Sequence, residues 1–347
     1  MIREAIAKLS DGYDLSECEA SLVMNEIMSG EATPAQISAY ITALRMKGET
    51  LDEVAGSART MRSLATQIRP KVSKLVDTCG TGGDGANTFN ISTTAAFIVA
   101  GAGLHVAKHG NRSVSSKCGS ADVLEALGIY VDLTPAQVEQ CINETGIGFL
   151  FSPVFHTAMR HAIGPRKEIG IRTIFNILGP LSNPACAEYQ VVGVYKAELT
   201  ELLAEALARL GTKEALVVFG TDGIDEVSLG APTLVSHLKN GTVDTYLVDS
   251  RDFGFLSVKK QDITGGSAAE NAAIIERVLT GERGPYRDVA LANAAAALLV
   301  AGLAQNLKQG VQLAAEIVDS GQALEKLHKL QMFSRRCAGD ATANSCM

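Results

Sequence analysis

The chain has 347 residues, 46% of them hydrophobic, which is enough to bury a sizeable core and suggests about two domains. Its formal net charge of −7 argues against a nucleic-acid-binding protein, because such proteins normally carry a basic face. No stretch approaches the roughly 20 apolar residues that span a bilayer, so we expect no membrane partner.

The cysteines and the N-terminus bear on where the protein resides. The seven cysteines are odd in number and include no CxxC pair, unlike a disulfide scaffold. The first residues contain no apolar run of signal-peptide length. We therefore expect reduced thiols in a cytoplasmic protein.

Residues 1–69 are predicted to form a small helical domain, because helix-start signals recur in this part of the chain. In each signal a hydroxyl residue precedes Glu or Gln by three positions, the pattern of a capping box. The three boxes are Ser16 with Glu19, Thr33 with Gln36, and Thr50 with Glu53. Gly30 and Gly48 are expected to end two of these helices.

After Pro70 the pattern changes to short apolar strands that alternate with helices. The predicted strands are 74–77, 104–108, 148–151, 189–195 and 214–220. This alternation predicts a larger α/β domain, residues 70–347, with a mostly parallel sheet. Segments 233–238 and 243–248 are predicted to pair as an antiparallel hairpin across Asn240-Gly241.

Two other segments of the chain carry expectations about packing. Residues 153–182 read as helical although they lie between strands, so we expect them to pack back on the N-terminal helices. The chain is predicted to be helical again from about Gly266. The small and polar residues from about Cys337 onward are expected to fray.

The segment DTCGTGGDGANTFNISTT, residues 77–94, is predicted to be a phosphate-binding loop between a strand and a helix. The alternative is a plain glycine-rich turn. The loop lacks the GK[ST] of a Walker A motif. It contains GxGxxG, but the next strand ends in Lys108-His109 without a carboxylate, which excludes NAD and leaves an NADP variant open. Asp84 suggests a ligand that also carries hydroxyls or a metal.

The segment KHGNRSVSSKCGSAD, residues 108–122, also lies between a strand and a helix. Cations and hydroxyls at this density favour an extended polyanion such as a diphosphate, although a solvated basic loop is the alternative. Since the carboxyl ends of parallel strands share one crevice, this loop and the glycine-rich loop are predicted to meet.

Asp225-Glu226 follows another predicted strand and is suited to Mg²⁺, which takes one or two carboxylates plus phosphate oxygens. The alternative is a solvated surface pair. Ser92 either offers a hydroxyl to the metal or caps the following helix. Arg166 and Arg172 are each able to clamp a carboxylate, with an ordinary salt bridge as the alternative. The sequence has no GxSxG and no HExxH motif.

Together, four segments resemble the signatures of the anthranilate phosphoribosyltransferase family, in order and spacing, over about residues 10–330. They are DTCGTGGDGANTFNIST, KHGNRSVSSKCGSADVLEALG, GPRKEIGIRTIFNILGPLSNPA and GTDGIDEVS. The resemblance implies a helical domain hinged to an α/β domain, the architecture shared with pyrimidine nucleoside phosphorylases. It also implies a homodimer formed through the helical domain.

The implied reaction transfers phosphoribosyl from 5-phosphoribosyl 1-diphosphate to anthranilate, with Mg²⁺, in tryptophan biosynthesis. The positions that match the family's diphosphate-donor contacts are Gly80, Gly83, Asp84, Thr88, Asn90, Ile91, Ser92, Thr93, Lys108, His109, Gly110, Asn111, Arg112, Ser113, Val114, Ser115, Ser116 and Ser120. Gly80, Asn111 and Arg166 match the anthranilate contacts, and Ser92, Asp225 and Glu226 match the metal ligands.

The chemistry implied by the resemblance needs no acid–base catalyst, because an aromatic amine attacks while neutral and loses its proton afterward. Two other functions stay open at this point. A pyrimidine nucleoside phosphorylase-like enzyme shares the fold, and a non-catalytic paralogue could instead bind nucleic acid.

Overall fold

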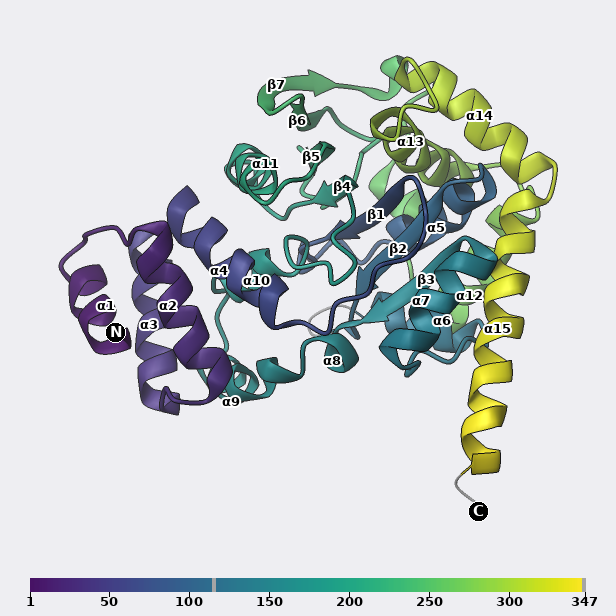
Figure 1. Cartoon of the computed structure of the whole chain (residues 1–347). Helices are drawn as coiled ribbons and strands as arrows, with labels where there is room; N and C mark the ends of the chain where they lie inside the picture. The colour runs from purple at the N-terminus through teal and green to yellow at the C-terminus, as the bar shows by residue number, and fades with distance from the viewer. Residues whose placement is uncertain (114–116, 345–347) are drawn as a thin grey trace.

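The computed structural model describes residues 1–113 and 117–344, with side chains to residue 339. The N-terminal helices lie together on one side of a sheet-centred body, and the C-terminal helix runs along the opposite side (Figure 1). The predicted fold class, a helical N-terminal part plus a larger α/β part with a mostly parallel sheet, is confirmed.

Four helices form the N-terminal part, and three of them begin where the capping boxes predict. The four helices are α1 (Ile2–Ser10), α2 (Glu17–Ser29), α3 (Pro34–Lys47) and α4 (Leu51–Leu64). The hydroxyls of Ser16, Thr33 and Thr50 each accept a hydrogen bond from the backbone N–H three residues later. Helix α2 ends at Gly30, whose φ of 80° lies in the left-handed region that glycine tolerates. These local signals therefore set the helix boundaries.

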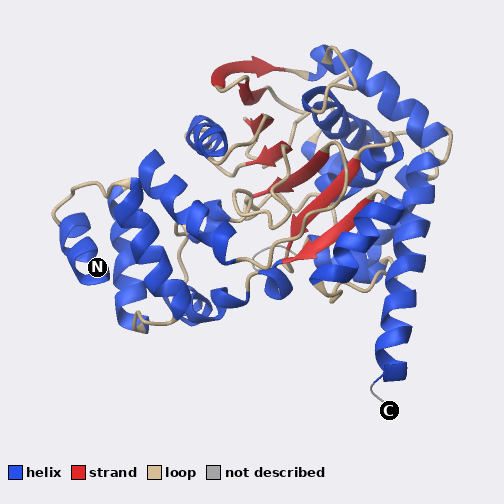
Figure 2. Cartoon of the chain, viewed as in Figure 1, coloured by secondary structure: helices blue, strands red, loops and turns tan. Residues whose placement is uncertain are grey.

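The sheet has seven strands in the order β3-β2-β1-β4-β5-β6-β7. The strands are β1 (Leu75–Gly80), β2 (His105–Gly110), β3 (Ile147–Phe151), β4 (Tyr189–Gly193), β5 (Glu214–Gly220), β6 (Thr233–Lys239) and β7 (Thr242–Val248). The first five pair in parallel, and β6 and β7 add the predicted antiparallel hairpin (Figure 2). Strand order reverses beside β1, so a crevice is expected where β1 and β4 end.

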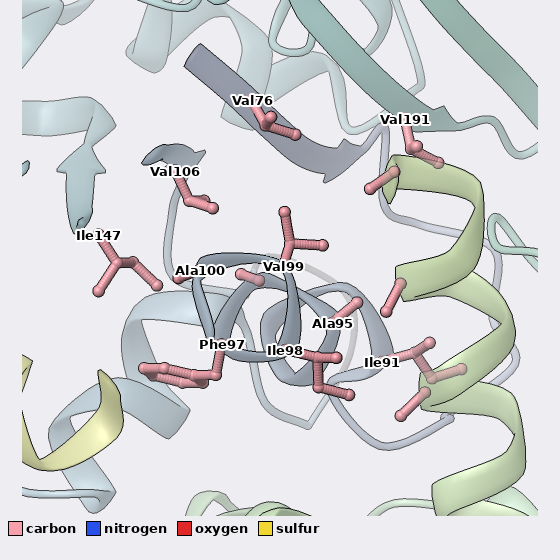
Figure 3. Close-up of a cluster of buried hydrophobic side chains, with 14 of the residues drawn as sticks. Val76, Ile91, Ala95, Phe97, Ile98, Val99, Ala100, Val106, Ile147 and Val191 are labelled. Atoms are coloured by element: carbon pink, nitrogen blue, oxygen red, sulfur yellow. The ribbon is translucent and has the colours of Figure 1, made fainter. Parts of the chain in front are cut away.

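One face of the sheet is covered by helices drawn mainly from the later half of the chain. These are α5 (Ile91–Gly101), α6 (Ser120–Ala126), α7 (Pro135–Thr145), α12 (Ala268–Leu279), α13 (Pro285–Val300), α14 (Leu307–Asp319) and α15 (Gln322–Asn344). Val99 of α5 lies beneath Val76 and Val106 of the adjacent strands (Figure 3). Helix α5 is buried nearly all round, which fixes its N-terminus at the carboxyl edge of the sheet.

The opposite face of the sheet shares a buried cluster with the N-terminal helices. Helix α11 (Leu199–Arg209) and the strand residues Val192 and Val217 belong to this cluster, as do Ile27 and Tyr40. The segment between β3 and β4 forms α8 (Ser152–Phe155), the short 3₁₀ turn η1 (Thr157–Met159), α9 (Arg160–Ile169) and α10 (Phe175–Leu178). Ala162 and Leu178 from that segment pack in the same cluster.

The expectation that the chain frays from about Cys337 is wrong. Helix α15 continues to Asn344. Leu330, Phe333 and Cys337 recur at helical spacing and are buried against the main core, which anchors the helix as far as Cys337. In the described part of the chain, no helix is both long and apolar enough to cross a membrane. None of the six described cysteines forms a disulfide, and Cys346 lies outside the described residues.

Candidate functional site

The glycine-rich loop folds over the edge of the sheet directly after β1. Gly82, Gly83 and Gly85 have φ values of 65°, 74° and 72°, a conformation that side chains disfavour. The N–H of Gly82 donates to Oδ2 of Asp225 at 2.8 Å. The loop therefore aims a backbone donor at a carboxylate of the protein, and its binding of phosphate stays a prediction.

Asp225 and Glu226 follow β5 and reach the same edge as the glycine-rich loop. The N–H of Ser92, at the start of α5, donates to Oε1 of Glu226 at 3.1 Å. The N–H of Asp225 lies 3.4 Å from Oδ2 of Asp84. Two segments far apart in sequence thus bring the predicted metal ligands together, with Asp84 beside them.

The electrostatics of these carboxyl groups are unfavourable without a cation. Desolvation, and then the charge of Asp84, raise the pKa of Asp225 above its usual value. Desolvation, and then the charge of Asp225, raise the pKa of Glu226. Carboxyl groups that repel one another in a half-buried crevice are a fitting place for a bound cation.

Because these carboxyl groups gather at one place, the oxygen atoms around them fit Mg²⁺. Mg²⁺ keeps several waters and takes one or two carboxylates together with substrate phosphate oxygens. Asp225, Glu226 and the Ser92 hydroxyl are hard oxygen donors of that kind. Among the described residues no group of three or more His, Cys, Asp or Glu makes a complete metal site, so the remaining oxygens must come from ligand and water.

We expect Mg²⁺ to raise the melting temperature of this protein more at about pH 8.5 than at about pH 6, because of Asp225 and Glu226. A carboxyl group with a raised folded-state pKa contributes stability that is complete below its unfolded value, about 4, and is lost as the pH rises through the folded pKa. A bound cation offsets that loss. Thermal unfolding with and without Mg²⁺ tests this, and an equal gain at both pH values would contradict it.

Lys108, the first cation of the second segment, is buried next to Ser92, one of the predicted metal ligands. Its ammonium donates to the carbonyl oxygen of Thr78 and lies 3.3 Å from the Ser92 hydroxyl. Burial lowers the pKa of Lys108, and the nearby carboxylate of Asp77 opposes that shift. Lys108 and the two carboxylates predicted to hold the metal therefore belong to one charge cluster.

The structure divides the remaining predicted donor residues into two groups. Asn111 and Ser120 are at the mouth of the second loop, where the Ser120 hydroxyl donates to the Asn111 carbonyl oxygen at 3.2 Å. His109 instead points into the protein, with its ring nitrogens 3.1 Å from the Gly179 carbonyl oxygen and 3.0 Å from the Ser152 hydroxyl. Burial lowers the pKa of His109 to about 3, so the imidazole ring is neutral.

Several other predicted positions are buried, bridged through the backbone or without a side chain. Ile91 and Thr93 are buried at the start of α5, and Thr88 forms a bridge with Thr264. Gly80 and Gly110 have no side chain by nature, and a Cβ on Gly80 would lie 2.8 Å from Oδ2 of Asp225. Val114, Ser115 and Ser116 lie outside the described residues.

The predicted arginines of the segment before β4 lie in different surroundings. The Arg166 guanidinium is 5.1 Å from the centre of the Phe175 ring, and desolvation lowers the pKa of Arg166. It has no carboxylate partner in the part of the chain that the structure describes. Arg172 donates to the carbonyl oxygen of Gly83 and lies over the Tyr195 ring. Arg172 thus connects this segment to the glycine-rich loop.

Two residues that shape the site were missed from the sequence. Asp77 is fully buried at the centre of the sheet, where it accepts from the Asn183 amide at 2.8 Å and from the His109 N–H at 3.2 Å. Asn271 of α12 donates to Oδ1 of Asn90 at 2.9 Å. The sequence does contain a signal for Asp77, because a charged residue inside the apolar run KLVDTC is unusual. It contains no signal for Asn271.

The sequence of the chain matches the two models of a glycosyl transferase family. Residues 72–324 match its a/b domain, and residues 3–65 match its helical bundle domain. The anthranilate phosphoribosyltransferase of Acetivibrio thermocellus is 54% identical over 334 residues, covering 96% of this chain and 97% of the relative. That of Symbiobacterium thermophilum is 54% identical over 340 residues, covering 98% and 100%.

The chain belongs to the anthranilate phosphoribosyltransferase family. The predicted resemblance is therefore confirmed. The crystal structure of the Thermus thermophilus family member superposes with a TM-score of 0.90 at 42% identity, covering 95% of this chain and 99% of that one. The Saccharomyces cerevisiae family member, solved in complex with PRPP and Mg, gives a TM-score of 0.89 at 29% identity, covering 96% and 98%.

Proposed function

We propose that this protein transfers the phosphoribosyl group of 5-phosphoribosyl 1-diphosphate to the amine of anthranilate. The products are N-(5-phosphoribosyl)anthranilate and diphosphate, and the reaction belongs to tryptophan biosynthesis. One observation carries the proposal: Asp225, Glu226, Ser92 and Lys108 converge at one edge of the sheet in a chain with full-length relatives of this family. The yeast family member was solved with PRPP and Mg, and another of its structures contains 4-fluoroanthranilate.

In the reaction the bond from ribose C1 to diphosphate breaks, and a bond from C1 to the amine nitrogen forms. Bound Mg²⁺, held by Asp225, Glu226 and the Ser92 hydroxyl, would supply positive charge to the leaving diphosphate. The buried Lys108 ammonium adds a second positive charge next to Ser92. The N–H groups of the glycine-rich loop and of the α5 N-terminus orient the phosphates. The remaining donor positions matched to the family belong to this proposal, except Arg112, whose side chain is paired with Glu125.

For the acceptor we propose that Arg166 binds the anthranilate carboxylate, with Asn111 and Gly80 beside the amine. Arg166 supports this because its half-buried guanidinium lies on an aromatic ring and pairs with no carboxylate of the described chain. The neutral amine attacks C1 and releases its proton afterward, so no acid–base residue is assigned. Neutral His109, with both ring nitrogens engaged, is consistent with that absence.

Arg166→Ala is expected to raise the KM for anthranilate by roughly ten- to a hundredfold, because a charge-assisted bidentate contact contributes about 1.5–3 kcal/mol. The KM for the diphosphate donor should change less than about threefold. Steady-state kinetics with each substrate varied in turn separate the two constants. Equal increases in both would remove Arg166 from the acceptor site.

The function itself is tested by the loss of anthranilate fluorescence when the protein is mixed with 5-phosphoribosyl 1-diphosphate and Mg²⁺. Phosphorolysis of thymidine without reaction of anthranilate would instead make the protein a pyrimidine nucleoside phosphorylase. Salt-sensitive DNA binding without turnover would make it a nucleic-acid-binding paralogue. The net charge of −7 argues against the latter.

We also propose a boundary between two domains at Arg69-Pro70, with residues 153–182 joined to the helical domain. The burial of Ala162 and Leu178 among residues of α2 and α3 supports this division. The gap between the two family models, residues 66–71, supports the boundary at Arg69-Pro70.

For the assembly we propose a cytoplasmic homodimer formed through the helical domain. An open groove between α1 and α3 supports this surface, because it is lined by apolar residues that include Leu9, Ala43 and the exposed Met46. Sedimentation equilibrium of the full chain measures the assembly, and a monomer at micromolar concentration would count against it.

A further inference from the structure

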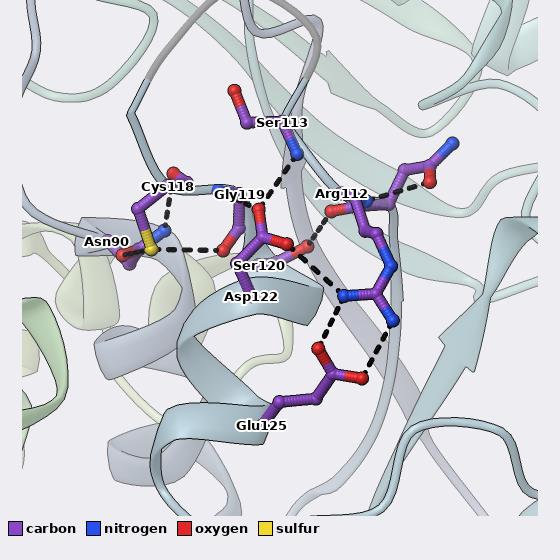
Figure 4. Close-up of polar contacts among 9 residues, drawn as sticks. Asn90, Arg112, Ser113, Cys118, Gly119, Ser120, Asp122 and Glu125 are labelled. Atoms are coloured by element: carbon purple, nitrogen blue, oxygen red, sulfur yellow. Dashed lines mark hydrogen bonds and ion pairs between the residues drawn. The ribbon is translucent and has the colours of Figure 1, made fainter. Parts of the chain in front are cut away.

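The second loop is closed at its base by one carboxylate. Asp122, in the first turn of α6, accepts through Oδ2 from the N–H of Ser113 at 3.0 Å and from the N–H of Gly119 at 2.8 Å (Figure 4). The chain enters the loop at Ser113 and leaves it at Gly119. The same oxygen therefore ties the two ends together, and it also caps α6.

The chain approaches itself so closely at this base that only glycine fits. A Cβ on Gly119 would lie 2.3 Å from the N of Ser113 and 2.8 Å from the carbonyl oxygen of Asn111. The N–H of Ala121 donates to that same Asn111 oxygen at 3.2 Å. The start of α6 is thus fastened to the end of β2, next to the predicted donor-binding positions.

Arg112 is the third member of this arrangement. Its Nη1 lies 3.4 Å from Oδ1 of Asp122 and also donates to Oε2 of Glu125, while Nη2 donates to Oε1 of Glu125 at 2.7 Å. Figure 4 shows the guanidinium facing both carboxylates. Although burial opposes it, hydrogen bonds from the N–H groups of Ser113 and Gly119 and from Arg112 lower the pKa of Asp122, which keeps it ionised.

A diphosphate contact by Arg112 would compete with a bidentate carboxylate pair that is already formed. Such a fork-to-fork pair is the most favourable geometry that a guanidinium offers, and both of its Nη atoms are used here. The family resemblance alone places Arg112 among the donor contacts. The hydrogen bonds place it at the base of the loop instead.

We propose that Asp122, Arg112 and Glu125 form a clamp that holds Ser113 and Gly119, the described ends of the second loop, and that Arg112 acts through this clamp without touching the diphosphate. The proposal rests on the proposed function, because the loop is taken to hold the donor. Asp122 and Glu125 become positioning residues, and the positive charge near the diphosphate is left to Lys108 and the metal.

The test is a charge swap across the pair. Arg112→Glu alone places three carboxylates together and is expected to raise the donor dissociation constant at least about tenfold. Adding Glu125→Arg restores opposite charges, so the double variant should return to within about threefold of the unaltered protein. Calorimetric titration of 5-phosphoribosyl 1-diphosphate with Mg²⁺ gives the constant without requiring turnover.

A double variant that binds the donor as poorly as Arg112→Glu alone would overturn the clamp and show that Arg112 contacts the diphosphate itself. A single variant with unchanged donor binding would overturn it as well. Lys213→Glu is the matched control, because it reverses one charge of an exposed ion pair with Glu188 at the opposite edge of the sheet. Its donor affinity should not change.

Asp122→Asn tests the clamp in a variant that preserves shape. It should raise the KM for the donor several-fold and leave the KM for anthranilate unchanged, whereas a general loss of stability would change kcat and both constants. An unchanged KM for the donor would show that Asp122 is not a positioning residue. Absence of any anthranilate turnover by the unaltered protein would refute the proposed function but leave the calorimetric comparison readable.

Discussion

Asp225→Asn combined with Glu226→Gln is expected to lower kcat/KM by about a thousandfold or more, with the fold retained. The double change removes both negative charges that are held at the end of β5 by Gly82 and Ser92. Each amide is close in shape to the carboxylate it replaces, so packing is preserved. What is lost is the attraction for Mg²⁺ and with it the charge that stabilises the departing diphosphate. Initial rates over a range of Mg²⁺ concentrations measure the effect.

The thermal behaviour of this double variant separates site chemistry from damage to the fold. Since desolvation and mutual repulsion raise the pKa of both carboxyl groups, their neutral replacements should leave the metal-free protein as stable or more stable. Glu201→Gln with Glu205→Gln on α11 removes the same charge elsewhere and serves as the control. Full activity in the Asp225/Glu226 variant, or the same loss in the control, would remove the pair from the metal site.

The local parts of this fold could be predicted from the sequence because their causes are local. A capping box is complete within four residues, so Ser16, Thr33 and Thr50 determine where helices begin whatever packs around them. The alternation of strands and helices likewise predicts the parallel sheet. Once strands are parallel, their carboxyl ends share an edge, and the meeting of Ser92 with Glu226 follows.

The partners of individual side chains in the site could not be predicted in the same way. Arg112 is a cation in a loop, and whether it meets a ligand or Glu125 depends on how α6 is placed, which composition does not encode. His109 lies in the same motif but turns toward Gly179, because the side chains of successive strand residues point to opposite faces. The sequence indicates which segments gather at the site. Burial and backbone contacts decide which atoms face the ligand.

Gly193→Ala is expected to lower the metal-dependent activity at least about a hundredfold. Gly193 belongs to none of the sequence motifs. The residue ends β4, where its carbonyl oxygen accepts from the N–H of Thr81 at 2.8 Å. A Cβ at this position would lie 1.5 Å from the carbonyl oxygen of Asp225 and 2.4 Å from its carbonyl carbon. Backbone atoms cannot rotate away, so the segment that carries Asp225 and Glu226 has to move.

That movement should disturb the geometry of the metal site more than the pairing of the sheet. Strand β4 keeps its pairing with β1 and β5, so we expect far-ultraviolet circular dichroism to be retained, while the stabilisation by Mg²⁺ is lost. Gly339→Ala is the matched control, because a Cβ there meets open space on helix α15 and the change should be neutral or stabilise by about 0.5–1 kcal/mol. If Gly193→Ala keeps both its activity and its response to Mg²⁺, the close approach of β4 to Asp225 does not position the metal ligands, and the glycine-rich loop alone must hold them.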